Sequence, residues 1–359
     1  MTAEKSRATA KAVQFELAGQ EIAPGDRATI DLEVAQLYTH APLSIPVQVI
    51  HGRKPGPVLL ISAAIHGDEL NGVEAVRQLL ALVDAKKLRG TLVAVPVVNV
   101  FGFNNKSRYL PDRRDLNRCF PGSERGSIAG RLAHQFFTQV VQRCSHIIDL
   151  HTGAVHRTNL PQLRVNMQDP ESASMAQAFD VPVVVNAVTR DGSLRAVAQE
   201  SGIPVITYEG GEALRYDPGA IKMAVQGCLR VMRHLGMLRS QRKVTKPMVI
   251  ARSTSWVRAE QNGTFRSLVG LGEWVSKGQA LAKISAPLGT VEGQIYAPKD
   301  GIVIGHQTLP LANEGDALFH LAYFKEDSAD EAQQQVDDFL EDVSEMQLVE
   351  DVEFPPQSE

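Results

Sequence analysis

The chain has 359 residues, of which 43% are hydrophobic and 22% charged. It is long enough to build a large core, and its length predicts two domains rather than one. Its formal net charge of −4 gives no reason to expect a nucleic-acid partner. The polar N-terminus lacks the apolar core of a signal peptide, and no run of about twenty apolar residues could span a membrane. Three cysteines at unrelated spacings indicate reduced thiols, so we expect a cytoplasmic protein.

The first two thirds of the chain alternate between two hydrophobic patterns. Residues 1–27 are predicted to be a loosely held lead-in, and the alternation begins after them. The predicted strands are Thr29–Val34, Ile45–Ile50, Val58–Ile65, Leu92–Val98, His146–Leu150, Gln162–Asn166, Val181–Val185 and Pro204–Thr207. The predicted helices are Leu70–Lys87, Ile128–Cys144, Pro170–Ala178, Leu194–Glu200 and Pro218–Leu238. For residues 28–243 this predicts an α/β domain with a mixed, largely parallel sheet and helices on both faces.

The pattern changes after residue 243. Residues 246–323 carry short β runs with frequent glycines, which predicts a small all-β domain. Two of its stretches, Leu271–Ala282 and Ala297–Val303, resemble the half-repeats of the biotinyl/lipoyl carrier fold, a barrel-sandwich. The hairpin between them, Ser285–Val291, has no lysine to carry a prosthetic group. We therefore interpret the domain as a scaffold that shapes a cleft.

Residues 325–359 form an acidic tail. The tail has one lysine and many acidic residues. Apolar residues recur periodically over Val336–Met346, which allows an amphipathic helix that docks on the body or on a partner. The interpretation that we favour is a solubilising, partly disordered tail.

A first cluster with chemical meaning is His66-Gly67-Asp68-Glu69. It follows an apolar strand run directly and precedes a predicted helix. His66 and Glu69 therefore lie on a strand-to-helix turn, where open α/β sheets bind their ligands. Their offset of three residues can bring both side chains to one point.

His151 follows a second apolar strand run. Two parallel strands that end side by side would bring His151 to His66 and Glu69. Two histidines and a carboxylate leave the fourth tetrahedral position open for water, which is typical of a catalytic zinc. A neighbouring carboxylate, Asp149 or Asp68, could accept the other ring N–H of a ligand histidine. Each histidine taken alone would be interpreted as an ordinary loop or core residue. Because both clusters follow apolar strands and can converge, we predict instead that they bind one zinc ion per chain.

The loop between these clusters is rich in arginine. Within eleven residues it carries four arginines and an asparagine, namely Arg108, Arg113, Arg114, Asn117 and Arg118. The planar guanidinium suits a carboxylate or a developing oxyanion. Arginines in loops also form surface pairs, and for Arg113 or Arg114 we favour such pairs with Asp112 and Asp115.

A last cluster is Tyr208-Glu209-Gly210-Gly211. Glu209 follows another apolar strand run, and the two glycines after it allow its side chain to reach into a cleft. A glutamate in this position could be the general base that takes a proton from water and returns it to a leaving amine. The alternative is that Glu209 is one of many loop acids.

In this order, the clusters resemble the succinylglutamate desuccinylase/aspartoacylase family, which belongs with the zinc carboxypeptidase-like hydrolases. The resemblance covers roughly residues 30–325. It implies a zinc-carboxypeptidase-like fold and a zinc ion bound by His66, Glu69 and His151. It also implies that Glu209 is the base.

By the same resemblance, Arg108 would polarise the scissile carbonyl, and Asn117 with Arg118 would hold a substrate carboxylate. The loop is about two residues longer than in aspartoacylase-like sequences, so Arg113 or Arg114 could take the role of Arg108. Arg114 therefore stays a candidate substrate-binding residue. The loop also resembles that of the N-acetyl-diaminobutyrate deacetylases within the same family.

The resemblance and the motifs together predict a zinc-dependent deacylase that cleaves the amide bond of an N-acyl amino acid or a similar small carboxylate. No nucleic-acid or membrane partner is expected. A metallocarboxypeptidase acting on the carboxyl end of a peptide would use the same chemistry, so the motifs do not separate the two. A non-catalytic metal-binding or ligand-binding protein would lack the base or the oxyanion arginine, and the sequence has both. The acyl group, the amine and a homo-oligomeric state stay open.

Overall fold

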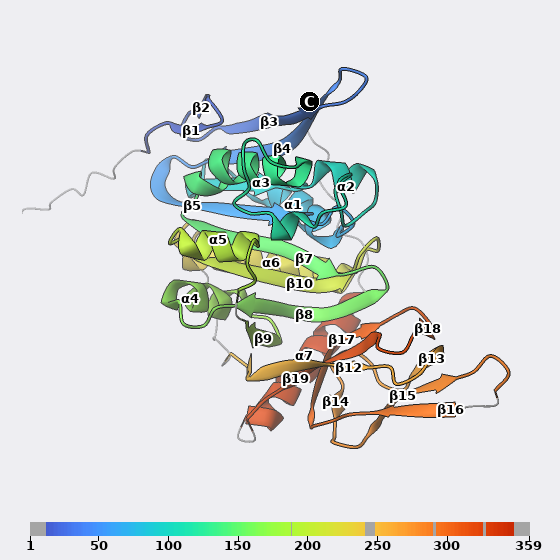
Figure 1. Cartoon of the computed structure of the whole chain (residues 1–359). Helices are drawn as coiled ribbons and strands as arrows, with labels where there is room; N and C mark the ends of the chain where they lie inside the picture. Colours follow the sequence, from blue (N-terminus) through green and yellow to red (C-terminus); the bar gives the residue numbers. More distant parts are fainter. Residues whose placement is uncertain (1–11, 188, 241–247, 290–291, 326–327, 348–359) are drawn as a thin grey trace, which may run out of the picture.

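The computed structural model describes residues 12–187, 189–240, 248–289, 292–325 and 328–347 (Figure 1). Within these ranges, none of the helices is both long and apolar enough to cross a membrane. The molecule is organised around one long sheet that extends from the N-terminal strands to the C-terminal ones.

Ten strands of this sheet form a continuous row. In spatial order they are β12 (Ser253–Arg258), β19 (Ala317–Tyr323), β17 (Gly301–Gln307), β8 (Arg157–Val165), β10 (Val205–Glu212), β7 (His146–Gly153), β5 (Lys54–Ala63), β6 (Arg89–Val95), β4 (Pro42–His51) and β3 (Arg27–Gln36). Three further strands pair with members of the row: β9 (Val183–Asn186) with β8, β11 (Ile250–Ala251) with β9, and β14 (Trp274–Val275) with β17.

The centre of the sheet is parallel and its flanks are antiparallel. β6, β5, β7 and β10 run parallel to one another, as do β8, β9 and β11. The pairs β3–β4, β4–β6, β10–β8, β8–β17, β17–β19 and β19–β12 are antiparallel. The sheet is therefore mixed, as predicted, but the prediction that it is largely parallel holds only for the centre.

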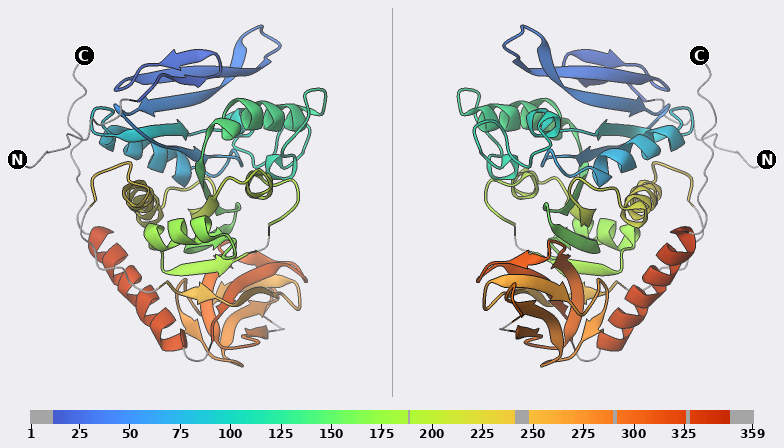
Figure 2. Two further views of the ribbon diagram at one scale, coloured as in Figure 1. Left: turned by 90° about the vertical axis from the view of Figure 1, so that its left-hand side faces the viewer. Right: turned by 90° about the vertical axis from the view of Figure 1, so that its right-hand side faces the viewer.

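Helices cover both faces of the sheet, as predicted (Figure 2). Buried side chains of α1 (Asn71–Leu82), α4 (Pro170–Phe179) and α6 (Pro218–His234) belong to one core cluster. Those of α2 (Val100–Asn104), α3 (Ile128–Gln139) and α5 (Leu194–Glu200) belong to another. The central strands are buried on both faces, which explains their nearly continuous apolar runs.

Local sequence signals set the ends of these helices. Ser127 caps α3 and Asp217 caps α6, because their side chains accept backbone N–H groups of the first turn at 3.2 and 2.9 Å. α1 ends before the predicted Lys87, since Val83 already takes an extended conformation with φ −93° and ψ 119°. The long helix α3 likewise gives way to a short 3₁₀ turn, Val141–Arg143, before β7.

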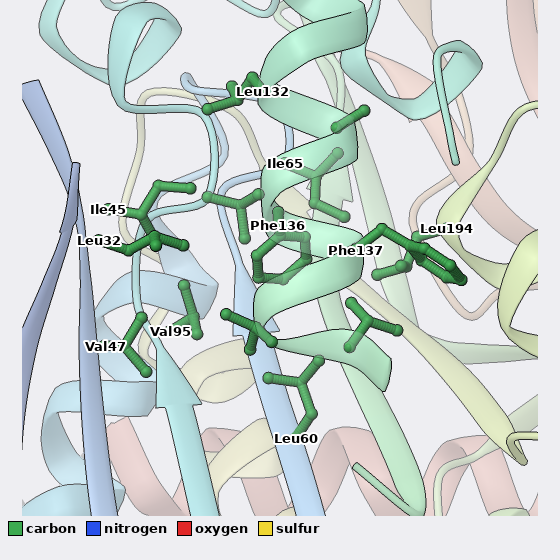
Figure 3. Close-up of a cluster of buried hydrophobic side chains, with 14 of the residues drawn as sticks. Leu32, Ile45, Val47, Leu60, Ile65, Val95, Leu132, Phe136, Phe137 and Leu194 are labelled. Carbon is green, nitrogen blue, oxygen red and sulfur yellow. The ribbon is translucent and has the colours of Figure 1, made fainter. Parts of the chain in front are cut away.

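Figure 3 shows how α3 packs on the sheet. Phe136 is fully buried and shares a core cluster with Leu60 of β5, Val95 of β6 and Ile45 of β4. Burial of one such aromatic side chain contributes roughly 1.5–3 kcal/mol. β5 is thus held firmly, and this strand carries the first predicted cluster at its end.

Residues 12–27 correct the prediction of a loosely held lead-in. β1 (Phe15–Leu17) and β2 (Gln20–Ile22) form an antiparallel hairpin, and Leu17 and Ile22 are buried in the core. His51 Nε2 lies 2.8 Å from the carbonyl oxygen of Val13. Strands of three residues are too short to produce a recognisable alternation, which is why the pattern did not predict them. Residues 1–11 lie outside the described residues.

The C-terminal β segment continues the long sheet. β17 pairs with β8, so β12, β17 and β19 extend the sheet of the α/β part. A second sheet contains β16 (Glu292–Tyr296), β15 (Ala280–Ser285), β13 (Gly263–Ser267) and β18 (Leu311–Ala312). The segment is built from strands, in line with the prediction. Its likeness to the biotinyl/lipoyl fold and the division of the chain into four parts stay predictions.

The preferred interpretation of the acidic tail was wrong for α7 (Ala329–Gln347), which is helical and docked (Figure 2). Ala332, Val336 and Phe339 are buried and share a core cluster with β17 and β19. A β-carbon added at Gly272 would lie 2.8 Å from Val336 Cγ1, so the contact is close. The structure thus supports the alternative of an amphipathic helix that docks on the body. Residues 348–359 lie outside the described residues.

We predict that Val336→Ala lowers the free energy of unfolding by about 1–3 kcal/mol, because two buried methyl groups are lost and a cavity remains. The exposed Glu331→Gln in the same helix should change it by no more than about 0.5 kcal/mol. Denaturant unfolding monitored by circular dichroism measures both values. Equal stability of the two variants would contradict the docking of α7.

Candidate metal centre and pocket

The first cluster forms a tight turn at the carboxyl end of β5. The backbone N–H of Glu69 donates to the carbonyl of His66 at 3.1 Å, so both side chains leave from one turn. Gly67 has no room for a side chain, since a β-carbon there would lie 2.0 Å from the carbonyl carbon of Gly102 in α2. The turn is therefore packed directly against α2, which positions His66 and Glu69.

His151 reaches the same point from the neighbouring strand. β5 and β7 pair in parallel with Ala63 opposite Leu150, so their carboxyl ends lie at one edge of the sheet. His66 Nδ1 lies 2.7 Å from Glu69 Oε1, and His151 Nδ1 lies 2.8 Å from Glu69 Oε2. The two Nδ1 atoms are 3.2 Å apart. The structure thus brings together the three side chains that we predicted as ligands.

These three residues fit a divalent metal ion. Their ligand atoms, one from each residue, lie within 4.8 Å of one another, and all three side chains are buried. In the part of the chain that the structure describes, no other group of three His, Cys, Asp or Glu side chains converges in this way. Two imidazoles and one carboxylate match the protein ligands of catalytic zinc, and other divalent ions can use them as well.

A carboxylate faces the outer ring nitrogen of each histidine. His151 Nε2 lies 2.7 Å from Asp149 Oδ2, and His66 Nε2 lies 3.2 Å from Asp115 Oδ1. Asp149 was one of the two predicted candidates. The other, Asp68, does not take this role, and its buried Oδ1 has no hydrogen-bond partner among the described residues. With Nε2–H donated to a carboxylate, each Nδ1 lone pair faces the common centre.

The charges at the centre are strongly coupled. Burial opposes ionisation of Glu69, but His66 and His151 outweigh it and lower the pKa of this carboxyl group. Burial would lower the pKa of His151, yet Asp149 and Glu69 raise it well above its usual value. Against the effect of burial, Glu69 also raises the pKa of His66. A centre that attracts protons in this way also attracts a divalent cation.

Arg108 is the arginine that the loop brings to the centre. Its guanidinium donates to Glu69 Oε1 at 3.2 Å and to Asp115 Oδ2 at 3.0 Å. The side chain of Arg114 is 62% exposed and lies 3.7 Å from Asp112 Oδ2. Arg114 does not line the pocket at the centre, so the structure does not bring this predicted residue to the others.

Asn117 and Arg118 lie on a short 3₁₀ helix, Leu116–Arg118, and both line the pocket. The side-chain oxygen of Asn117 accepts the backbone N–H of Leu194 at the start of α5, at 2.9 Å. Arg118 Nη1 donates to the carbonyl of Asn117 at 2.5 Å. These contacts hold both residues at the wall. Among the described residues none accepts a hydrogen bond from the amide N–H₂ of Asn117, which can therefore donate to a ligand.

Glu209 lies beside the centre, on β10. It is the strand partner of His151 on β7. Its carboxylate accepts hydrogen bonds from Arg164 Nε and from Asn159 Nδ2, both at 2.8 Å. The predicted base therefore lines the same pocket as the predicted metal ligands, and two donors from β8 orient it.

The pocket that contains these groups has a volume of about 590 Å³. Several larger polar or aromatic side chains that the sequence analysis did not select also line it, among them Arg157, Asn159, Arg164, Arg190, Arg195, Trp256, Arg258 and His320. They come from β8, from α5 and the loop before it, and from β12 and β19. The one signal that could have revealed some of them is an arginine within a predicted strand, as at Arg164 in Gln162–Asn166.

Comparison with known proteins identifies a family of deacylating enzymes. The sequence model of the succinylglutamate desuccinylase/aspartoacylase catalytic domain matches residues 55–235, which include the candidate ligands and Glu209. The chain is 26% identical over 293 residues to the N-alpha-acetyl-L-2,4-diaminobutyric acid deacetylase of Halomonas elongata, a match that covers 77% of the chain and 85% of the relative. It is 30% identical over 159 residues to the succinylglutamate desuccinylase of Pseudomonas aeruginosa, covering 41% of the chain and 46% of that relative.

The fold is also found among solved structures. The product-bound ectoine utilization protein EutE (DoeB) of Ruegeria pomeroyi matches with a TM-score of 0.76 and 25% sequence identity. The match covers 84% of this chain and 97% of the other. The likeness therefore extends over most of both chains.

We predict that the affinity of the centre for a divalent metal falls as the pH is lowered. Binding needs both Nδ1 atoms free of protons, and the raised pKa of His151 and His66 makes protons stronger competitors. The affinity should fall by up to about tenfold per pH unit for each proton displaced. Competition against a chromophoric chelator between about pH 6 and 8 measures it. In Asp149→Asn the decrease in metal affinity should occur at lower pH. A metal affinity that does not depend on pH would show that protons and metal do not compete for these histidines.

Proposed function

The chain belongs to the succinylglutamate desuccinylase/aspartoacylase family, and on that premise we propose that it is a zinc-dependent hydrolase that removes the acyl group from an N-acyl amino acid or a similar small carboxylate. The observation that carries this proposal is the convergence of His66, Glu69 and His151 beside Glu209 in one pocket. A pocket of about 590 Å³ has the size of a small-molecule site, which favours a small substrate over a peptide. The relatives include a deacetylase and a desuccinylase, which agrees with deacylation.

We assign the zinc ion to His66, Glu69 and His151. When bound, zinc supplies Lewis acidity that polarises an acyl carbonyl and lowers the pKa of water. The protein contributes the orientation of the ligands. Asp149 and Asp115 fix which ring nitrogen of each histidine faces the centre, so no rotation of the rings is needed on binding.

Glu209 is assigned as the general base and acid. Its carboxylate accepts a proton from the attacking water and returns it to the departing amine. Arg164 and Asn159 each hold one of its oxygens, which keeps the carboxylate in the pocket beside His151. A base that is held in place in this way needs no reorientation between the two proton transfers.

Arg108 is assigned to the developing oxyanion, and Asn117 with Arg118 to a substrate carboxylate. Arg108 lies in hydrogen-bond contact with Glu69, so its guanidinium is next to the proposed metal. A single donor to an oxyanion contributes roughly 3 kcal/mol to transition-state stabilisation. Asn117 and Arg118 lie on the same loop as Arg108 and line the same pocket, which supports their assignment to a carboxylate near the scissile bond.

The cellular compartment and the partners of the protein remain predictions. Three cysteines at unrelated spacings favour a reducing, cytoplasmic compartment. The proposed partner is the small-molecule substrate alone, and the formal net charge of −4 gives no reason to add a nucleic acid.

We predict that Glu209→Gln retains its zinc but lowers kcat by about 10²–10⁴-fold, because the amide cannot accept the proton of the attacking water. Elemental analysis and steady-state hydrolysis of N-acyl amino acids measure the two properties. Glu212→Gln is the matched control, since Glu212 lies on the same strand and does not line the pocket. Full turnover by the Glu209 variant would rule out its role as base.

We further predict that Arg108→Gln lowers kcat by about 10²–10³-fold, whereas Arg114→Gln stays near the wild-type value. The reason is that only the first of these two side chains reaches the centre. The same hydrolysis assay measures both variants. The metal content of Arg108→Gln shows whether the contact of Arg108 with Glu69 is needed for metal binding. The reverse order of effects would transfer the oxyanion role to Arg114.

A further inference from the structure

Glu209 and the turn that carries His66 and Glu69 do not lie on neighbouring strands. The turn follows β5, Glu209 lies on β10, and β7 separates the two strands (Figure 1). The sheet therefore connects the two parts of the site only by way of β7. A general base has to lie within about 2.6–3.2 Å of the atom whose proton it takes. The spacing between the turn and β10 thus has to be set closely for the proposed reaction.

β10 is irregular directly after Glu209. Glu209 is the partner of His151 on β7. The next pair joins Glu212 to Gly153, so β10 contains one residue more than β7 over this stretch, which is a β-bulge. Within the bulge Gly211 takes a left-handed conformation, with φ +75°, that favours glycine. A bulge bends its strand and re-aims the side chains beside it. The direction of Glu209 therefore depends on how the bulge is held.

Asn71, the first residue of α1, holds the bulge. Its side-chain amide donates to the carbonyl oxygen of Gly210 at 3.1 Å, and its side-chain oxygen accepts the backbone N–H of Asp217 at 3.1 Å. A β-carbon at Gly211 would lie 2.3 Å from Asn71 Nδ2, so the amide fills the space beside this glycine. Asn71 is only 2% exposed, so loss of its side chain would leave buried polar groups without partners.

The start of α1 is itself fixed on the strands of the metal centre. Asn71 follows Glu69 by two residues, so the turn that carries this ligand leads directly into the helix. A β-carbon at Gly72 would lie 2.9 Å from Cβ of Ala63 and 2.8 Å from Cβ of Leu150, so α1 begins in close contact with β5 and β7. Asn71 therefore reaches across β7 and connects the ligand turn with β10.

A backbone contact reinforces this connection. The N–H of Leu214, two residues beyond the end of β10, donates to the carbonyl of Asp68 in the ligand turn at 2.8 Å. Asn71 does not line the pocket, so it does not contact a substrate there. Its influence on the reaction passes through the backbone of Gly210 to Glu209.

We propose that Asn71 is a positioning residue: through the carbonyl of Gly210 it sets the place of the Glu209 carboxylate relative to the metal centre. The inference rests on the proposed function, in which Glu209 is the base. Arg164 and Asn159 hold the carboxylate end of Glu209, whereas Asn71 holds the backbone from which this side chain leaves. Both ends have to be fixed, because a misplacement of about 1 Å can lower a rate about 10²-fold.

Asn71→Ala in the zinc-loaded protein tests the proposal. It should lower kcat for an N-acyl amino acid by about 10–100-fold, with KM changed by less than about threefold and zinc content unchanged. If this variant does not fold, Asn71→Ser replaces it, since a serine hydroxyl is too short to reach Gly210.

Ser172→Ala is the matched control. Ser172 is also buried, and its hydroxyl oxygen accepts the backbone N–H of Val205 at the other end of β10, at 3.0 Å. This variant loses a comparable hydrogen bond to the same strand and should keep kcat within about twofold of the wild type. An equal loss of kcat in both variants, or loss of zinc from the Asn71 variant, would overturn the proposal, because Asn71 would then support the fold or the ligands and not the base.

Crystal structures of the wild type and the Asn71 and Ser172 variants separate this inference from the proposed reaction. In Asn71→Ala the carboxylate of Glu209 should move by about 1 Å or more relative to His151, and in Ser172→Ala it should stay in place. If the wild type hydrolyses no N-acyl amino acid, the proposed function fails, yet a displaced Glu209 still supports its positioning by Asn71. A carboxylate that keeps its place and its contact with Arg164 in Asn71→Ala overturns the inference.

Discussion

The parallel pairing of β5 with β7 is the constraint on which the site depends. The two strands are paired with Ala63 opposite Leu150, and their carboxyl ends release His66 and His151 at one edge of the sheet. A shift of one residue would turn His151 to the opposite face, away from Glu69. Both strands are buried between two hydrophobic cores, so the same shift would also disrupt the packing. The register that stabilises the fold is therefore the register that brings the candidate ligands together.

The centre also requires that its buried charges compensate one another. Glu69 is only 1% exposed, and an isolated carboxylate in this position would be strongly destabilising. It lies instead between two imidazoles and the guanidinium of Arg108. Behind His151, Asp149 accepts a hydrogen bond from Ser62 at 2.8 Å, so the support extends into the sheet itself. The groups that neutralise Glu69 would also hold the ligands in place for a divalent ion.

The sequence predicted the candidate ligands because each of them stands at the end of an apolar strand run, a local signal. It did not predict Asp115, which reaches His66 from a loop 49 residues away. The wall of Arg157 and Trp256 was missed for a similar reason, since it depends on pairing between strands that are distant in the chain. For α7 the periodicity was visible, but the surface on which it docks was not, and disorder was wrongly favoured. Local sequence patterns thus predicted the candidate ligands, but they did not predict contacts between segments that are distant in the chain.

The central claim is that one divalent ion binds between β5 and β7 and serves the hydrolysis. Anomalous diffraction from crystals grown with zinc, at the zinc absorption edge, tests it most directly. The account predicts a single strong peak at about 2.0–2.2 Å from Nδ1 of His66, Nδ1 of His151 and a carboxylate oxygen of Glu69. A protein that hydrolyses N-acyl amino acids without a peak at this position, or with the ion held by other residues, would contradict it.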